Sequence, residues 1–286
     1  MGSRDQHIVM LPFLAHGHLI PFLALANQIH QTTGFTITIV STPLNVHHLQ
    51  STISSYSNIR LAELPFCSTD HGLPPNAENT ENLSLHDIPI LCNASLTLEA
   101  SFPTLVRDIM DKEGYGRPPL CIISDVFFGW AVNVAKSVGS VSVTFTTCGA
   151  YGTAAYMSFW LHLPHLYTDY EDFFKLPWFP DSHRFHRSQL NPLAKVADGT
   201  DSWSMFMRSQ ISLSLDSHGW LCNTVEKIEP LGMEVLRKYL KLRVRAIGPL
   251  LPRAVLKKQY SSSSFGSKTF KQRDGKTSGI SPEKMH

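Results

Sequence analysis

The chain has 286 residues, of which 43% are hydrophobic and 17% are charged. That composition excludes collagen-like, disulfide-dense and wholly disordered proteins, and it can build the core of one large or two ordinary domains. The net charge of +2 is uneven. Residues 253–286 hold eight of the 25 Lys and Arg and two of the 23 Asp and Glu, which gives +6 there and −4 for residues 1–252. A mildly acidic folded part gives no argument for a nucleic-acid partner.

The five cysteines are scattered and form no C-x-x-C pair, so we expect neither a disulfide framework nor a zinc site. This pattern fits a reducing compartment, and we expect a cytoplasmic protein. No run of about 18 apolar residues occurs, so we expect no membrane-spanning segment. The N-terminus resembles a signal peptide only loosely, because Pro12 interrupts its apolar run and His16-Gly17-His18 follows.

Short apolar runs alternate along the chain with segments of helical length. We expect strands at 7–13, 35–40, 59–64, 120–124, 141–146, 219–223 and 244–247. We expect helices at 19–31, 43–55, 92–111, 129–138, 149–163, 203–215 and 225–240. Near-continuous apolar strands that alternate with helices predict a parallel sheet covered by helices on both faces, which is a Rossmann-like α/β fold.

Three segments lack a clear period. Residues 65–90 have the composition of a loop. Residues 164–200 hold five Pro or Gly, and a loop of that length predicts either a binding lid or a disordered segment. From Arg253 onward Ser, Gly and Lys dominate, which predicts an interdomain linker or disordered tail over residues 253–286, after a folded domain over residues 1–252.

Polar side chains lie at the ends of three predicted strands. His16-Gly17-His18 follows the first, Asp125 the fourth, and Thr146-Thr147 the fifth. Because ligands of an open parallel sheet bind outside the carboxyl ends of its strands, these residues predict a site on one rim. Two structural explanations stay open: His18 as a helix N-terminal residue that bonds a loop carbonyl, and Asp125 as a turn or N-cap residue.

Other types of site match the sequence poorly. It contains no G-x-G-x-x-G and no G-x-S-x-G, and Gly275-Lys276-Thr277 lacks the leading Gly of a phosphate loop because Phe270 stands there. The His16 and His18 pair has no Cys or carboxylate beside it in the sequence, so we expect no metal. A flavodoxin-like regulator would need an acidic cluster at the rim, where we find only Asp125.

Several segments match one family in order and spacing. They are HIVMLPFLAHGHLIPFLALA, CIISDVFFGWAVNVAKSVG followed by VSVTFTTCGA, LCNTVEKIEP and AIGPLLP. Together they resemble the family 1 UDP-dependent glycosyltransferases of plants: a first strand with a Gly-His turn, a strand–Asp–helix–strand–Thr segment, and Asn-Thr and Gly-Pro-Leu markers. The resemblance covers about residues 7–252 and implies the N-terminal, acceptor-binding half of a GT-B architecture.

The resemblance also implies roles for three residues at the rim. His18 matches the family's general base, Asp125 the carboxylate that orients and charge-balances it, and Thr147 the threonine that touches the donor sugar or phosphate. The implied reaction is a metal-independent, inverting transfer of a sugar, expected to be glucose, from a UDP-sugar co-substrate. The implied acceptor is a hydroxyl of a lipophilic small molecule such as a flavonoid or phenol.

Aromatic residues near the strand ends are candidates for the acceptor pocket. They are Phe13, Phe127, Phe128 and Tyr151. His16 is a further candidate, at a position where the family usually has a small or apolar residue. For each aromatic residue, ordinary core packing is the alternative.

The family's donor-binding signatures do not occur in the sequence. They are a Trp-x-Pro-Gln start, His-Cys-Gly-Trp-Asn-Ser, a later Glu and a final Asp-Gln. We therefore expect that these 286 residues lack the donor domain and are inactive alone. The alternative is a non-catalytic half-protein that binds a small molecule or a partner. We expect the face that meets the second domain to expose apolar surface and to permit dimerisation.

Overall fold

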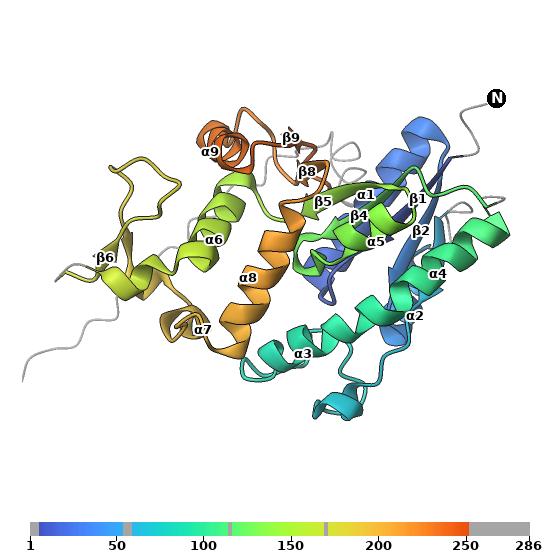
Figure 1. Ribbon diagram of the computed structural model, residues 1–286, viewed down its shortest axis with the longest axis horizontal. Helices are drawn as coiled ribbons and strands as arrows, with labels where there is room; N and C mark the ends of the chain where they lie inside the picture. Colours follow the sequence, from blue (N-terminus) through green and yellow to red (C-terminus); the bar gives the residue numbers. More distant parts are fainter. Residues whose placement is uncertain (1–5, 54–58, 114–115, 169–170, 252–286) are drawn as a thin grey trace, which may run out of the picture. The chain divides into compact units, whose positions relative to one another are not determined.

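The computed structural model describes residues 6–53, 59–113, 116–168 and 171–251. Within these ranges a seven-stranded sheet has the order β3-β2-β1-β4-β5-β8-β9, and every neighbouring pair is parallel (Figure 1). Its strands are β1 (His7–Leu11), β2 (Thr36–Ser41), β3 (Ile59–Glu63), β4 (Cys121–Asp125), β5 (Val141–Thr146), β8 (Gly219–Cys222) and β9 (Arg243–Ala246). The predicted parallel sheet is confirmed, because each expected strand lies within two residues of its predicted bounds.

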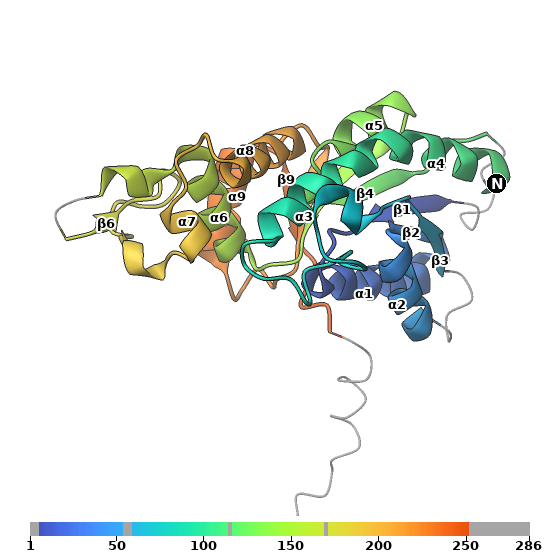
Figure 2. The same cartoon turned by 90° about the horizontal axis from the view of Figure 1, so that it is seen from below.

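Helices cover both faces of this sheet, as the sequence predicts. They are α1 (His16–Thr33), α2 (Pro43–Ile53), α3 (Ile88–Ala94), α4 (Leu98–Glu113), α5 (Ala131–Ser137), α6 (Ala150–His162), α7 (Pro192–Lys195), α8 (Ser202–Ser214) and α9 (Pro230–Leu240). Figure 2 shows α1 and α2 on one side of the sheet and α4 and α5 on the other. Successive strand side chains point to opposite faces. Ile8 and Met10 of β1 therefore join the core under α1, while Val9 and Leu11 join the core under α4.

The sequence predicts one continuous helix over residues 92–111, and this prediction is wrong. The structure instead has α3, a short 3₁₀ helix η3 (Ser95–Thr97) and then α4. The hydroxyl of Ser95 donates to the carbonyl of Cys92 at 2.7 Å, and that of Thr97 donates to the carbonyl of Ala94 at 2.7 Å. Such local side-chain bonds compete with the regular helical ladder and account for the break.

Two helices begin three or more residues away from their expected first residues. α1 begins at His16, which places His18 in its first turn. α9 begins at Pro230 and not at residue 225, since a proline is favoured in the first turn of a helix, where no backbone donor is needed. The residues before it form a turn in which the amide of Ile228 donates to the carbonyl of Val225 at 2.9 Å.

The described residues of 164–200 are ordered by packing, so a structureless segment is the wrong prediction for them. They form η5 (Pro164–Tyr167), η6 (Arg187–Gln189), α7 and a small antiparallel sheet of β6 (Phe173–Phe174) and β7 (Phe185–His186). Phe174, Leu176, Trp178 and Phe179 are buried. Burial of these apolar side chains against α6 and α9 stabilises a segment that shows no period in the sequence.

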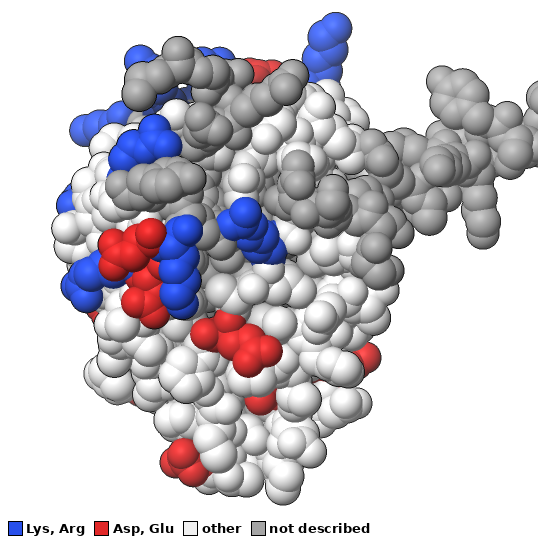
Figure 3. All heavy atoms as spheres, turned by 90° about the vertical axis from the view of Figure 1, so that its right-hand side faces the viewer, with Lys and Arg blue, Asp and Glu red and all other residues white. Residues whose placement is uncertain are grey.

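The predicted tail, residues 253–286, lies outside the described residues, so this domain division stays a prediction. Among the helices that the structure describes, none has both the length and the apolar character needed to cross a bilayer. On the face drawn in Figure 3, acidic and basic side chains lie in small groups, one of which contains both signs, and no large patch of one sign is seen. A mixed surface of this kind does not favour a polyanion on that face.

Candidate functional site at the strand ends

The sheet order brings three predicted site segments together. β1 lies between β2 and β4, and β4 pairs with β5, so the turns that follow β1, β4 and β5 are neighbours at one edge of the sheet. The order reverses between β1 and β4, where the chain continues to β2 on one side and to β5 on the other (Figure 1). Such a switch point is where open parallel sheets bind their ligands.

His18 and Asp125 meet at this switch point. Nδ1 of His18 lies 2.6 Å from Oδ2 of Asp125, although 107 positions separate the two residues in the sequence. The Asp125 side chain is fully buried, while the His18 side chain keeps 19% of its surface exposed. The other carboxylate oxygen of Asp125 accepts a hydrogen bond from the amide of Phe127 at 3.1 Å and caps the 3₁₀ helix η4 (Val126–Phe128). Asp125 therefore does act as an N-cap, and it contacts His18 as well.

Asp125 determines the electrostatics of this histidine. Burial lowers the pKa of His18, but the charge of Asp125 and the hydrogen bond to it outweigh burial, so the pKa of His18 is raised above its ordinary value. With Nδ1 held by the carboxylate, the imidazole presents Nε2 on its opposite edge. The arrangement can accept a proton from a ligand at Nε2 and stabilise the resulting positive charge.

Two aromatic rings lie beside His18. Its ring centroid lies 5.6 Å from that of Phe13 and 5.4 Å from that of Phe127, and these two phenylalanines contact each other at 5.1 Å. Phe128 is fully buried and packs against Phe13 and Trp130. Of the three phenylalanines, Phe127 is only partly buried and is therefore the one that a ligand beside His18 meets first.

The other two acceptor candidates contact residues other than His18. His16 stacks on His48 at 4.5 Å, and its Nδ1 lies 3.8 Å from Oε1 of Glu81. Residues two apart on a helix face different directions, so His16 and His18 do not converge on one ligand. Among the described residues, no three His, Cys, Asp or Glu side chains are grouped as a metal site requires. The ring of Tyr151 contacts that of Phe179, with the centroids 5.0 Å apart.

Thr147 lies in the turn between β5 and α6, which two further residues hold in place. The side-chain amide of Asn223 donates to the carbonyl of Thr147 at 3.3 Å, and its Oδ1 accepts from the amide of Leu250 at 2.8 Å. The carboxylate of Glu229 accepts from the amides of Ala150 at 3.0 Å and Tyr151 at 3.2 Å. Glu229 thus neutralises the N-terminus of α6, where the helix dipole favours a negative charge.

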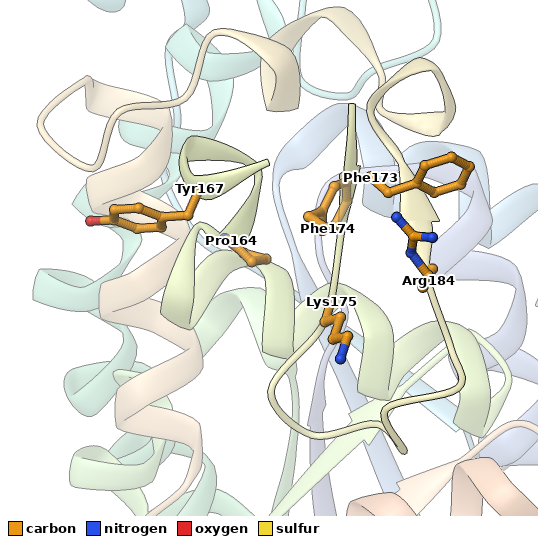
Figure 4. A pocket seen from close by; sticks show the side chains of 6 residues that line it. All are labelled: Pro164, Tyr167, Phe173, Phe174, Lys175 and Arg184. Atoms are coloured by element: carbon orange, nitrogen blue, oxygen red, sulfur yellow. The ribbon is translucent and has the colours of Figure 1, made fainter. Parts of the chain in front are cut away.

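Two cavities lie beside α6 in the described part of the chain. The first, which we call the α6 pocket, has a volume of about 260 Å³ and lies between one face of α6 and the segment from Phe174 to Ala194. The second, the hairpin pocket, has a volume of about 340 Å³ and is lined by residues on both arms of the β6/β7 hairpin. Phe174 lines both cavities. Figure 4 shows the Arg184 side chain of the hairpin pocket reaching toward Phe173, whose ring centroid lies 4.4 Å from the guanidinium carbon.

The sequence is similar to those of known plant enzymes. The chain is 49% identical to Crocetin glucosyltransferase 3 of Crocus sativus over 248 residues, which are 86% of this chain and 52% of that protein. It is 39% identical to UDP-glycosyltransferase 92A1 of Arabidopsis thaliana over 254 residues, 87% of this chain and 51% of that protein. The chain is homologous to the N-terminal half of plant UDP-glycosyltransferases. It spans about half the length of the curated relatives it matches, and no family model matches it.

The fold agrees with that of solved UDP-glycosyltransferases. The structure of UGT71G1 of Medicago truncatula, solved in complex with UDP-glucose, superposes with a TM-score of 0.66 at 16% sequence identity. The match covers 87% of this chain and 53% of that protein. The seven-stranded sheet with its helices is therefore the N-terminal domain of a GT-B architecture.

The sequence analysis assigned no role to two residues that contact the turn of Thr147 and the start of α6. Asn223 and Glu229 belong to the segment LCNTVEKIEP, which marks the family resemblance without indicating what its polar residues do. The available signal is the position of Asn223 directly after β8, because the carboxyl end of a strand in a parallel sheet lies at the rim. No local pattern indicates that Glu229 reaches the first turn of α6.

Proposed function

We propose that this chain is the acceptor-binding half of a UDP-glycosyltransferase and supplies the general base of an inverting sugar transfer. The observation that carries the proposal is the contact of His18 with the buried carboxylate of Asp125 at 2.6 Å, beside the rings of Phe13 and Phe127. The names of the two relatives, a glucosyltransferase and a glycosyltransferase, support it. The proposed acceptor is a hydroxyl of a lipophilic small molecule such as a flavonoid or phenol.

The proposed chemistry starts from the neutral imidazole. Asp125 accepts the hydrogen bond from Nδ1–H of His18, so the lone pair of Nε2 faces the hydroxyl of the acceptor. As the proton moves to Nε2, the acceptor oxygen bonds to the anomeric carbon of the sugar. The bond from that carbon to the diphosphate oxygen breaks, and UDP leaves with the electron pair. Attack opposite the leaving group inverts the anomeric carbon, and Asp125 stabilises the imidazolium that forms.

The proposed donor is UDP-glucose, with Thr147 as its contact on this half. Thr147 is partly exposed beyond the end of β5, and Asn223 holds its carbonyl. We assign the uridine and diphosphate to the second half of the enzyme, because residues 1–286 contain none of the family's donor signatures. Occupation of the α6 N-terminus by Glu229 supports that assignment, since a phosphate there would meet a carboxylate. The proposal includes no metal, as the family resemblance implies.

The five free cysteines support a cytoplasmic location within this proposal, since exposed thiols such as Cys67 and Cys148 persist where the surroundings are reducing.

A joined enzyme tests the proposal. Residues 1–251 are fused to the donor half of a related plant UDP-glycosyltransferase, and UDP release is measured with UDP-glucose and a panel of flavonoids and phenols. The joined enzyme should release UDP, whereas residues 1–286 alone should not, because without the donor half nothing positions the sugar or stabilises the leaving diphosphate.

Each other result has a definite meaning. Phenol binding without UDP release from the joined enzyme would favour the alternative of a non-catalytic binding protein. Turnover of UDP-glucose by residues 1–286 alone would contradict the assignment of the donor site to the second half.

A further inference from the structure

The turn after β8 lies between two other parts of the rim. Asn223 and Thr224 follow β8, and β8 lies between β5 and β9 in the parallel sheet (Figure 1). The turn after β5, which carries Thr147, is therefore on one side of them, and residues 247–251, which follow β9, are on the other. Hydrogen bonds join residues 223–229 to both neighbours, so this segment connects them.

Asn223 binds one neighbour with each end of its side-chain amide. Its Nδ2 donates to the carbonyl of Thr147 at 3.3 Å, and its Oδ1 accepts from the amide of Leu250 at 2.8 Å. Because a backbone carbonyl only accepts and a backbone amide only donates, these two partners fix the orientation of the side chain. An ionised aspartate could accept from Leu250 but could not donate to Thr147. Asparagine therefore suits this double contact, and aspartate does not.

Residues 247–250 lie directly against the same turn. The amide of Gly248 donates to the carbonyl of Thr224 at 2.9 Å. A Cβ at Gly248 would collide with Oδ1 of Asn223, so a residue without a side chain lets the backbone pass this close. The side chain of Leu250 is buried in the core under α1. Core packing and the bond to Asn223 together determine where the amide of Leu250 lies.

The turn of Thr147 is held at both of its ends. Glu229 accepts from the amides of Ala150 at 3.0 Å and Tyr151 at 3.2 Å, which holds the end that continues into α6. Asn223 holds the other end through the carbonyl of Thr147. Loss of the contact with Asn223 would therefore free the residue that carries the proposed donor contact, while the start of α6 stays in place.

Thr147 can contact a donor reproducibly only if its backbone is fixed. Threonine branches at Cβ, so the position of its hydroxyl follows closely from the backbone of the same residue. We propose that Asn223 is a positioning residue for the donor, which connects Thr147 to residues 247–250. The donor contact is then in place only while the segment that leads to the second half lies against the turn after β8. This inference rests on the proposed function, in which Thr147 contacts the donor and a linker begins at residue 253.

Asn223→Asp in the joined enzyme tests the inference. This substitution keeps the size of the side chain and the acceptor for Leu250, but it removes the donor to Thr147. The KM for UDP-glucose should rise ~5-fold or more, which is the scale of one lost hydrogen bond. The KM for the phenol and the acid limb of the pH profile should not change, because His18 is untouched. A merely structural role would lower kcat through the fraction of folded enzyme and leave the KM for UDP-glucose unchanged.

A double-mutant cycle shows whether Asn223 acts through Thr147. Thr147→Ala removes the hydroxyl but keeps the backbone carbonyl to which Asn223 donates, and it should raise the KM for UDP-glucose by itself. In that background Asn223→Asp should raise the KM by less than ~2-fold, because the contact that it positions is already absent. A direct repulsion between the new carboxylate and the diphosphate would raise the KM equally in both backgrounds.

Asn93→Asp is the matched control for the change of side chain. Asn93 is also partly buried, and its Nδ2 also donates to a backbone carbonyl, that of Pro89 at 2.8 Å. The same exchange of an amide for a carboxylate in α3 should leave the KM for UDP-glucose within ~2-fold of that of the unchanged enzyme.

Two substitutions of Leu250 test the connection without sugar transfer. Leu250→Pro and Leu250→Ala both shorten the buried side chain, but only proline removes the amide that donates to Asn223. Hydrogen exchange of residues 1–286 is followed by mass spectrometry in peptides that cover residues 147–151. Exchange there should be ~2-fold or more faster in Leu250→Pro than in Leu250→Ala, since one end of the connection is lost.

The outcomes separate this inference from the proposed function. An unchanged KM for UDP-glucose in Asn223→Asp or in Thr147→Ala, or an equal effect of Asn223→Asp in both backgrounds, overturns the positioning role. Continued sugar transfer in those variants leaves the proposed function standing. If the joined enzyme releases no UDP, the proposed function is overturned, and the donor role of Asn223 with it. Equal exchange in the two Leu250 variants overturns the connection to residues 247–250 whether or not the joined enzyme is active.

Discussion

The rim between β1 and β4 and the layer formed by α6, α9 and residues 171–195 are built in different ways. At the rim, Leu11 pairs with Ser124 near the ends of two parallel strands, so strand register brings His18 and Asp125 together. In the layer, side-chain packing determines the structure, as where Trp178 stacks on Tyr239 with ring centroids 5.0 Å apart. The proposed chemistry therefore lies on the regular part of the fold, and the layer belongs to the irregular part.

This difference separates the expected effects of substitutions. A change at the rim should reduce turnover and leave the sheet intact, because His18 lies beyond the end of β1 and Asp125 is the last residue of β4. A change in the layer should alter stability more than turnover, because side-chain packing is the main interaction that holds its backbone in place.

The largest effect is expected for His18→Ala. In the joined enzyme we expect a loss of about 100-fold or more in kcat, which is the usual scale for removal of a general base. The melting temperature should fall, because the fully buried carboxylate of Asp125 loses its partner, so activity is measured at a temperature at which both enzymes are folded. His86→Ala is the control, since His86 is 89% exposed. Full activity of His18→Ala would show that the base is misassigned.

Asp125→Asn should give a smaller loss of activity together with a shift of the pH profile. The base acts only as a neutral imidazole, so kcat/KM should fall as the pH decreases through the pKa of His18. Burial lowers that pKa and Asp125 raises it to above its ordinary value. Asparagine removes the negative charge but keeps burial, so the acid limb should move to lower pH.

Asparagine removes the charge of Asp125 without removing its second hydrogen bond. Its side-chain oxygen can still accept the hydrogen bond from the amide of Phe127, so the cap of η4 is retained. Initial rates between about pH 5 and 9 check the shift, around the ordinary pKa of histidine. An acid limb that does not move would contradict the coupling of Asp125 to His18.

Two glycine-to-alanine changes should have opposite effects on stability. By helix propensity alone, each would stabilise its helix by about 0.5–1 kcal/mol. A Cβ at Gly152 of α6 meets open space, so that gain should be seen. A Cβ at Gly232 of α9 would collide with the backbone of Tyr151 in α6, so Gly232→Ala should lower the free energy of unfolding by about 1–3 kcal/mol.

Urea denaturation of residues 1–286 measures both effects. Each variant is the control for the other, because the same methyl group is added within a helix in both. Equal changes in the free energy of unfolding would show that the packing of α9 on α6 is looser than the structure indicates.

Much of the fold was predictable, and the failures have particular causes. Strand β5 was predicted at its observed bounds, because VSVTFT is rich in β-branched residues and ends at a turn. The break between α3 and α4 was missed, since the hydroxyls of Ser95 and Thr97 bond to nearby carbonyls without changing the apolar pattern. At the candidate site, the strand ends indicated His18, Asp125 and Thr147 as candidates, and the structure brings His18 and Asp125 into contact. The contact of Glu229 with α6 was missed, because it joins residues 79 positions apart.

The sequence by itself determined the alternation of strands and helices, because apolar periodicity is a local property that each segment carries alone. It also determined that polar residues lie at or just beyond the ends of β1, β4 and β5, and so share a rim. Only the tertiary structure decided that Asp125 both caps η4 and bonds His18, that Asn223 and Glu229 hold the turn of Thr147, and that residues 171–195 fold onto α6. These contacts join residues far apart in the chain, and their geometry follows from packing, which no local pattern encodes.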